Sequence, residues 1–137
     1  MFDSYNRRIN YLRISVTDRC NLRCTYCMPA EGIALMQHGD ILSFEEIMEV
    51  VDNSILMGVD KIRITGGEPL VRKGIVNLVQ MIASRPAIRD LGMTTNGQLL
   101  EQFATPLKEA GLHRINISLD TLDPEKYREI TRGGNIE

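Results

Sequence analysis

Apolar and polar residues alternate along four short segments of this chain. The segments are Tyr11–Thr17, Lys61–Thr65, Leu91–Thr95 and Arg114–Leu119. In each, two or three leucine, isoleucine, valine or methionine residues stand at alternate positions, and the other residues are mostly polar, charged or glycine. Strict alternation is the signature of a β-strand whose two faces meet different surroundings. The apolar faces are therefore expected to pack on helices, and the polar faces to lie together on the other side of a sheet.

The segments between the predicted strands show helical spacing. Ser43 and Glu46 form a capping box that begins the first helix, and Gly58 stands where the C-terminal cap is expected. A second apolar stripe covers Ile75–Ile82. Strands and helices thus alternate along the chain.

Two further helices complete this pattern. A third helical segment begins near Leu99, and Pro106 is expected to restart it as a first-turn residue. Asp123 and Pro124 cap a fourth helix that runs to about Ile130. Four strand–helix units in a row predict an α/β fold with parallel strands and right-handed crossovers, an incomplete TIM-like β/α barrel.

The polar strand faces carry two arginines, Arg13 and Arg63. Unpaired charge is too costly to bury in a dry core. The interior of the predicted barrel is therefore expected to be a cavity for a polar, anionic ligand. An open antiparallel sheet with one wetted face is the alternative, and the intervening helices disfavour it.

Length and charge narrow the class of protein. The chain has 137 residues, enough for one domain, and its 16 basic and 18 acidic side chains leave a formal charge of −2. We therefore expect no nucleic-acid partner. No apolar run is long enough for a membrane span, and the first residues have no signal-peptide character. A cytoplasmic protein is predicted, where thiols stay reduced.

The only three cysteines of the chain are Cys20, Cys24 and Cys27, spaced as C-x-x-x-C-x-x-C. Three thiolates can hold three irons of a [4Fe–4S] cluster, which normally takes four cysteines. The remaining iron would be open to a small molecule. The spacing therefore indicates a cluster that takes part in chemistry.

Three alternative roles for these cysteines stay open. They could pack in a core, or two of them could form a disulfide and leave an odd thiol. A zinc site would need a fourth ligand, for which His38 and His113 are the candidates. The tight cluster of cysteines in a polar segment favours iron and sulfide.

Several polar motifs follow the predicted strands directly. They are Thr65–Pro69, which contains two glycines and a glutamate, Thr94–Gly97 and Ser118–Asp120. With the cysteine segment, all fall at the carboxyl ends of strands, which is the catalytic face of β/α barrels. Tyr26, beside the last cysteine, could stack on a flat ligand or simply pack.

The cysteine motif with Tyr26, followed by Gly66-Gly67-Glu68-Pro69, resembles the radical S-adenosylmethionine enzymes. The longer strings Tyr11–Asn21, Lys61–Leu70, Thr94–Gly97 and Asn116–Asp120 resemble the GTP 3′,8-cyclase family within them. That resemblance implies a lyase that forms (8S)-3′,8-cyclo-7,8-dihydroguanosine 5′-triphosphate in molybdenum cofactor biosynthesis. It also implies reductive cleavage of S-adenosylmethionine to methionine and a 5′-deoxyadenosyl radical.

The resemblance also implies roles for individual residues. The three cysteines would ligate the [4Fe–4S] cluster and are the catalytic set. Contacts to S-adenosylmethionine are implied for Tyr26, Gly66, Gly67, Glu68 and Ser118, and contacts to GTP for Arg13, Arg63 and Thr94. An electron donor is implied as partner.

The resemblance covers only the first part of such enzymes. Residues 1–137 are expected to form a truncated core domain that lacks the later strands and a segment with a second cluster. The last predicted strand would then be a bare edge, which leaves a homodimer open. Two alternatives remain, a radical enzyme with another substrate and a non-catalytic metal-binding fragment.

Overall fold

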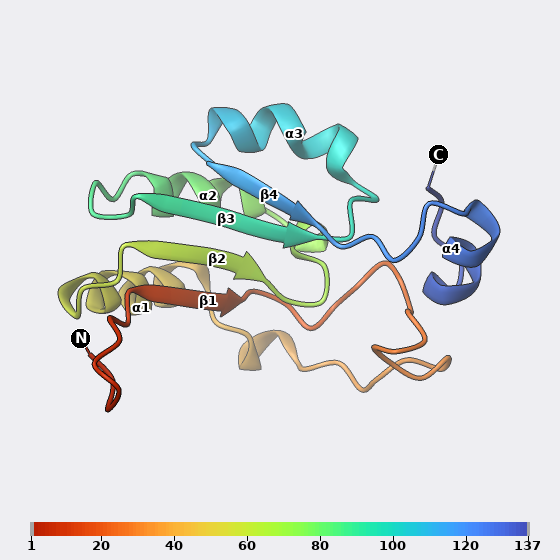
Figure 1. Cartoon of the computed structure of the whole chain (residues 1–137), viewed down its shortest axis with the longest axis horizontal. Helices are drawn as coiled ribbons and strands as arrows, with labels where there is room; N and C mark the ends of the chain where they lie inside the picture. Colours follow the sequence, from red (N-terminus) through yellow and green to blue (C-terminus); the bar gives the residue numbers. More distant parts are fainter. Residues whose placement is uncertain (1, 137) are drawn as a thin grey trace.

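The computed structural model describes residues 2–136, apart from the side chain of His38. Four parallel strands form one sheet in the order β1-β2-β3-β4 (Figure 1). The strands are β1 Tyr11–Ser15, β2 Lys61–Thr65, β3 Asp90–Thr95 and β4 Arg114–Ile117. Each strand pairs with the next along the chain, so the predicted parallel α/β sheet is confirmed.

The helices between the strands pack on one face of the sheet (Figure 1). They are α1 Phe44–Leu56, α2 Ile75–Ala83 and α3 Leu100–Glu109. Two short 3-10 turns lie at His38–Asp40 and Pro69–Val71. The apolar residues of β2 and β3 are buried against these helices, with Ile64 and Met93 at 0% exposure. The alternation in the sequence therefore marks the core face correctly.

The caps predicted for the first and the last helix are present. Glu46 N–H donates to the Ser43 hydroxyl, and Ser43 N–H donates to the Glu46 carboxylate. Gly58 follows α1 with φ of +95°, a left-handed conformation that glycine adopts without strain. The Asp123 carboxylate accepts from the first amides of α4, Pro124–Thr131.

Two expectations about the later elements are wrong. Pro106 does not restart a helix but lies inside the continuous helix α3. The carboxyl end of β4 was expected to pack its apolar residues on a helix, yet Ile117 is 53% exposed and Leu119 45% exposed. The reason is the position of α4, which lies beyond the carboxyl ends of the strands instead of on the sheet face (Figure 1).

Helix α4 packs against the segment that carries the cysteines. Arg23 N–H donates to Thr131 O at 3.1 Å, and Thr25 N–H donates to Ile130 O at 2.8 Å. The Arg132 side chain adds bonds to the carbonyl groups of Arg23 and Met28. The last helix thus covers the cysteine segment at the end of the sheet.

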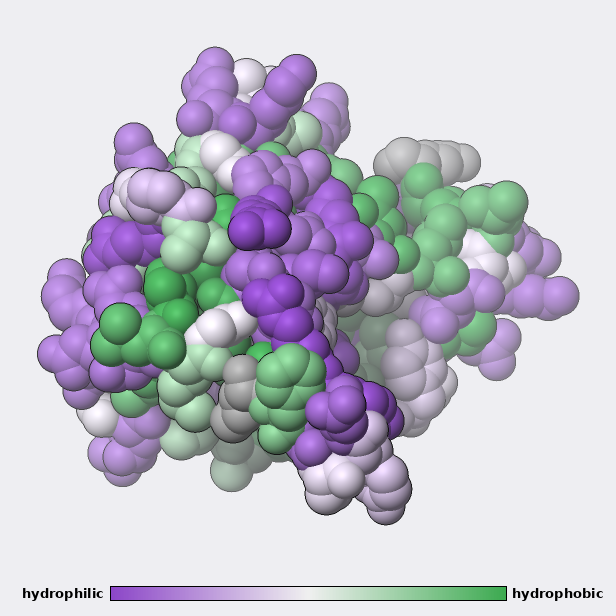
Figure 2. Space-filling view, turned by 60° about the vertical axis from the view of Figure 1, so that its left-hand side comes forward, coloured by the Kyte–Doolittle hydropathy of each residue, from purple (hydrophilic) through white to green (hydrophobic). Residues whose placement is uncertain are grey.

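The face shown in Figure 2 is mostly hydrophilic, with apolar side chains in separate patches. No helix within residues 2–136 is both long and apolar enough to cross a membrane. The other face of the sheet is the polar one, where Arg13 and Arg63 are register partners on β1 and β2. The sheet is open at both edges, as expected for a barrel of which only four strand–helix units are present.

Candidate functional site

The three cysteines line one cavity at the carboxyl ends of the strands. This cavity has a volume of about 250 Å³, and most of the residues predicted for the site lie in its wall. Its lining includes Cys20, Cys24, Cys27, Tyr26, Gly66, Gly67, Thr94 and Ser118. The cysteine segment that follows β1 therefore meets residues at the carboxyl ends of β2, β3 and β4 there, as the positions of the motifs predicted.

The cysteine segment has a defined local conformation. Cys27 N–H and Met28 N–H both donate to Cys24 O, at 2.9 and 3.1 Å, which closes a turn around the last two cysteines. Leu22 N–H points to the Cys20 sulfur at 3.4 Å. All three thiols are free, so no disulfide joins them.

The thiols also interact electrostatically. Burial raises the pKa of Cys24, and the nearby charges of Cys20, Asp120 and Cys27 raise it further, against a hydrogen bond from Tyr26. Three thiolates this close repel one another, so a positively charged centre between them would relieve the repulsion. This donor set fits an iron–sulfur cluster, in which each thiolate binds a different iron.

The described residues supply no fourth ligand for a zinc ion bound to the three cysteines. His113 lies just before β4, where its Nδ1 accepts from Leu91 N–H at 3.0 Å. The side chain of His38 lies outside the described part of the structure. Within the described part, no three histidine, cysteine or acidic side chains gather around a point that could hold one metal ion.

The two glycines after β2 have a packing role in addition to the cofactor contact that the resemblance implies. A Cβ on Gly66, at φ of +147°, would lie 2.6 Å from Thr17 O, and one on Gly67 would collide with Arg19 O. The loop of residues 66–68, called the glycine loop below, packs against the segment that leads to Cys20. Gly67 N–H and Glu68 N–H donate hydrogen bonds to carbonyl groups of that segment. Their absence of side chains therefore lets two backbone segments touch, in addition to lining the cavity.

Glu68 is buried at 1% exposure and lies outside the cavity wall. Its carboxylate accepts from Leu70 N–H at 3.1 Å, from the Thr95 hydroxyl at 2.7 Å and from Asn96 N–H at 2.7 Å. A buried carboxylate needs such partners, because burying an unpaired charge costs far more free energy than burying an unpaired neutral polar group. Glu68 thus joins the glycine loop to the end of β3.

Arg13 and Arg63 are register partners on the polar face of the sheet, and each lies two residues before the position that pairs next to the cavity. Arg13 is exposed, whereas the Nε of Arg63 is buried and has no hydrogen-bond partner among the described residues. Ser15 and Thr65 are the next register partners toward the cavity, on the same polar face of the sheet. An unpaired buried guanidinium donor is the feature that a bound acceptor would satisfy.

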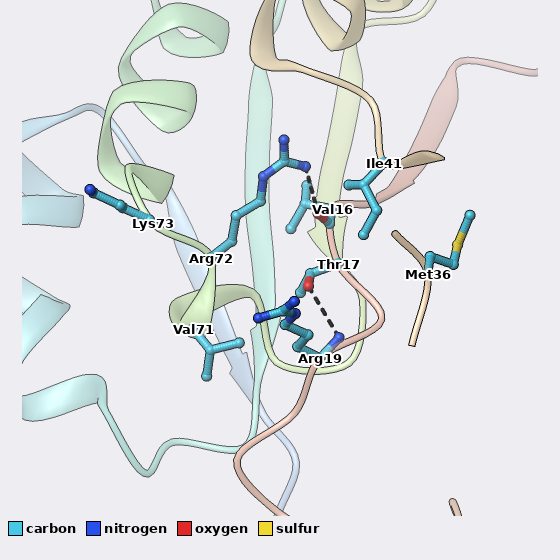
Figure 3. Close-up of a pocket in the computed structure, with 8 residues that line it drawn as sticks. All are labelled: Val16, Thr17, Arg19, Met36, Ile41, Val71, Arg72 and Lys73. Atoms are coloured by element: carbon cyan, nitrogen blue, oxygen red, sulfur yellow. Dashed lines mark hydrogen bonds between the residues drawn. The ribbon is translucent and has the colours of Figure 1, made fainter. Parts of the chain in front are cut away.

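A second cavity of about 200 Å³ lies beside the segment between β1 and the cysteines (Figure 3). Arg19, Arg72 and Lys73 contribute cationic side chains to its lining. Arg72 is already engaged, since it donates to Val16 O at 2.6 Å and to Leu42 O, and its guanidinium lies 4.5 Å from the Phe44 ring centre. Figure 3 shows the bond to Val16, through which Arg72 fastens the chain that leads to Cys20.

Sequence reasoning assigned no role to Asn96 or Asp120. Asn96 N–H and side chain contact Glu68, Asn21 and Cys20, and Asp120 accepts from the Tyr26 hydroxyl at 3.0 Å. Burial and the bond to Asp120 both raise the pKa of Tyr26. The position of both residues directly after strands was the only signal in the sequence that pointed to them.

Comparison with known proteins connects this geometry to a family. Residues 14–137 match the model of the Radical SAM superfamily. A GTP 3′,8-cyclase of Alkaliphilus oremlandii is 60% identical over 136 residues, which are 99% of this chain and 42% of that relative. One of Pelotomaculum thermopropionicum is 61% identical over 136 residues, with the same shares. The chain thus spans less than half the length of these curated relatives.

Solved structures share the fold. Streptococcus suis SuiB matches 90% of this chain and 27% of its own, with a TM-score of 0.69 and 22% identity. The same protein bound to S-adenosylmethionine gives a TM-score of 0.64 at 24% identity, over 90% of this chain and 26% of its own. BtrN in complex with AdoMet and 2-DOIA gives 0.64 at 22% identity, over 90% of this chain and 51% of its own.

Proposed function

Because this chain belongs to the radical SAM superfamily, whose members use a [4Fe–4S] cluster and S-adenosylmethionine, we propose that it forms the cluster-binding and cofactor-binding part of a GTP 3′,8-cyclase. The observation that carries this proposal is the cavity in which three cysteines from the loop after β1 meet the carboxyl ends of β2, β3 and β4. The curated relatives named for this activity support the choice of reaction.

Cys20, Cys24 and Cys27 would each hold one iron of the cluster and leave the fourth iron for the cofactor. When bound, the cluster and S-adenosylmethionine supply one-electron cleavage of a sulfonium and the hydrogen abstraction that follows. The protein's part is to hold these groups and to exclude water from them. Tyr26, Gly66, Gly67 and Ser118 are the proposed cofactor contacts, since they share the cavity with the cysteines.

Glu68 is retained as a proposed cofactor residue on the resemblance alone. Its carboxylate already accepts three hydrogen bonds from neighbouring residues. Four lone-pair positions are available on a carboxylate, so one acceptor position remains for a ligand ammonium.

The proposed substrate is GTP, which would lie on the polar face of the sheet. Arg13 and Arg63 are permanent cations with forked donors suited to phosphate or purine oxygens. The buried, unpaired Nε of Arg63 supports a bound acceptor at this place. Thr94 lines the cavity at the end of β3 and would contact the part of GTP nearest the cluster.

The test begins with anaerobic reconstitution of the chain with iron and sulfide. The reduced protein is expected to show a [4Fe–4S] electron paramagnetic resonance signal that changes when S-adenosylmethionine is added. Cys24→Ala should lose the signal. A colourless protein, or a cluster whose spectrum ignores the cofactor, would refute the proposed site.

Substrate choice has a separate test. Equilibrium dialysis with labelled GTP measures binding to the reconstituted chain, to Arg63→Ala and to Arg89→Ala. Arg89 is an exposed arginine before β3 and serves as the matched control. Loss of binding in Arg63→Ala alone supports GTP on the polar face. Equal binding by all three proteins would contradict a GTP site at Arg63, and no binding by any of them would favour a radical SAM enzyme with a different substrate.

A further inference from the structure

The side chain of Asn96 reaches the first cysteine from a distant part of the chain. Asn96 follows β3, and its Nδ2 lies 3.8 Å from the Cys20 sulfur and 2.8 Å from Asn21 Oδ1. The amide group has two hydrogens on this nitrogen, so it can donate to both partners at once. Cys20 receives a second N–H from Leu22 at 3.4 Å.

The orientation of this amide is determined by its other contacts. Asn96 Oδ1 accepts from Gln98 N–H at 3.0 Å, and a backbone N–H can only donate. The oxygen must therefore face Gln98, which directs the nitrogen toward Cys20. The donor is thus assigned by the hydrogen-bond network rather than by choice of rotamer.

Buried Glu68 holds Asn96 in place through the backbone. Asn96 N–H donates to Glu68 Oε2 at 2.7 Å, and the neighbouring Thr95 hydroxyl donates to Oε1 at 2.7 Å. Thr95 is 2% exposed and Glu68 1% exposed, so this junction excludes water. Charge-assisted hydrogen bonds of this kind are short and strong. The donor to Cys20 is therefore preorganised by a residue of the glycine loop.

We propose that Asn96 is a positioning residue that donates a hydrogen bond to the Cys20 thiolate and thereby raises the reduction potential of the bound cluster. The inference rests on the proposed function, because it requires the cluster on Cys20. Reduction adds negative charge to the cluster and its sulfurs. A donor that points at a ligating sulfur stabilises this charge, and hydrogen bonds to sulfur are among the determinants of cluster potential.

The experiment is an anaerobic redox titration followed by electron paramagnetic resonance. Asn96→Ala removes the donor, whereas Asn96→Asp keeps the acceptor for Gln98 N–H and replaces the donor with a carboxylate oxygen. Asn77→Ala, on the exposed side of α2, is the matched control. We expect a lower midpoint potential in Asn96→Ala, a still lower one in Asn96→Asp, and no change in Asn77→Ala. Equal potentials in all four proteins would overturn the inference.

A second measurement needs no Asn96 variant and therefore decides the question even where such variants hold no cluster. The unsubstituted chain is prepared with asparagine labelled with ¹⁵N only at the side-chain amide, and the reduced cluster is examined by electron spin echo modulation. A ¹⁵N coupling that persists in Asn21→Ser supports donation from Asn96, and a spectrum without such a coupling overturns it.

The two proposals fail in different ways. An unsubstituted chain that holds no cluster, or whose cluster ignores S-adenosylmethionine, contradicts the proposed function and this inference with it. A normal cluster that responds to the cofactor, but has the same potential with and without Asn96, contradicts the inference alone.

Discussion

Replacement of Gly67 by alanine is expected to separate the glycine loop from the cysteine segment. The added Cβ would lie 2.7 Å from Arg19 C and 2.9 Å from Asp18 O, and closer still to Arg19 O. These are backbone atoms, which cannot rotate away as a side chain can. Ordinary contact distances of about 3.5 Å require the two segments to move apart by about 1 Å.

That displacement breaks two hydrogen bonds. Gly67 N–H to Thr17 O is 2.7 Å and Glu68 N–H to Arg19 O is 2.8 Å, so both would exceed the usual range. Each bond contributes about 1 kcal/mol net, and overpacking adds about 1–3 kcal/mol. We therefore expect Gly67→Ala to lower the free energy of unfolding by about 3–5 kcal/mol.

Urea unfolding followed by circular dichroism measures this change. The matched control is Gly39→Ala, because a Cβ on Gly39 meets no atom within 4 Å. This control is expected to be neutral or to gain at most about 1 kcal/mol. With a urea slope of about 2 kcal/mol per molar, Gly67→Ala should lower the midpoint by roughly 1.5–2.5 M. A midpoint equal to that of Gly39→Ala would refute the packing argument.

Three further predictions concern a helix cap, an ion pair and the cysteine segment. Ser43→Ala removes the side-chain acceptor of the α1 capping box and should lower the free energy of unfolding by about 1 kcal/mol in urea titration, whereas no change would contradict the cap. Arg85 donates two hydrogen bonds to Asp52 and holds the pKa of that carboxyl below its ordinary 3.8. The Asp52 carboxyl is therefore harder to protonate in the folded protein than in the unfolded chain, so the ion pair stabilises the fold above about pH 4 and loses this effect as the pH falls further. The unfolding midpoints of the wild type and Asp52→Asn should differ at neutral pH and converge in acid. Arg132→Ala removes two bonds to carbonyl groups of the cysteine segment, so iron uptake should fall while thermal unfolding stays close to that of Arg89→Ala; full iron uptake would argue against this anchor.

Much of the fold could be predicted from the sequence, because strands and helix ends depend on the pattern of neighbouring residues. Alternation places apolar side chains on one strand face, and the caps at Ser43 and Asp123 mark where helices begin. These signals need only neighbours in the chain, and the structure confirms them. The position of the polar motifs at the carboxyl ends of strands follows from the same order, since parallel strands share one such edge.

The two wrong predictions concern features that depend on packing between segments distant in the chain. Pro106 follows the rules for a helix start, yet the packing of α3 on the sheet keeps the helix continuous through it. The alternation in β4 predicts burial of Ile117, but burial requires a partner on that face, and α4 lies at the strand ends instead. A residue pattern states which face is apolar, and it cannot state what covers that face.

The sequence by itself determined the strands, the helices of the core and the cysteine spacing that predicts an open iron site. Only the tertiary structure decided which residues surround that site. Two of the three hydrogen bonds to the buried Glu68 carboxylate come from the distant residues Thr95 and Asn96, and Asn96 reaches Cys20 across 76 positions. Buried polar groups and sulfur ligands must find hydrogen-bond partners wherever the fold brings donors, and those partners are set by the packing of segments rather than by their order in the chain.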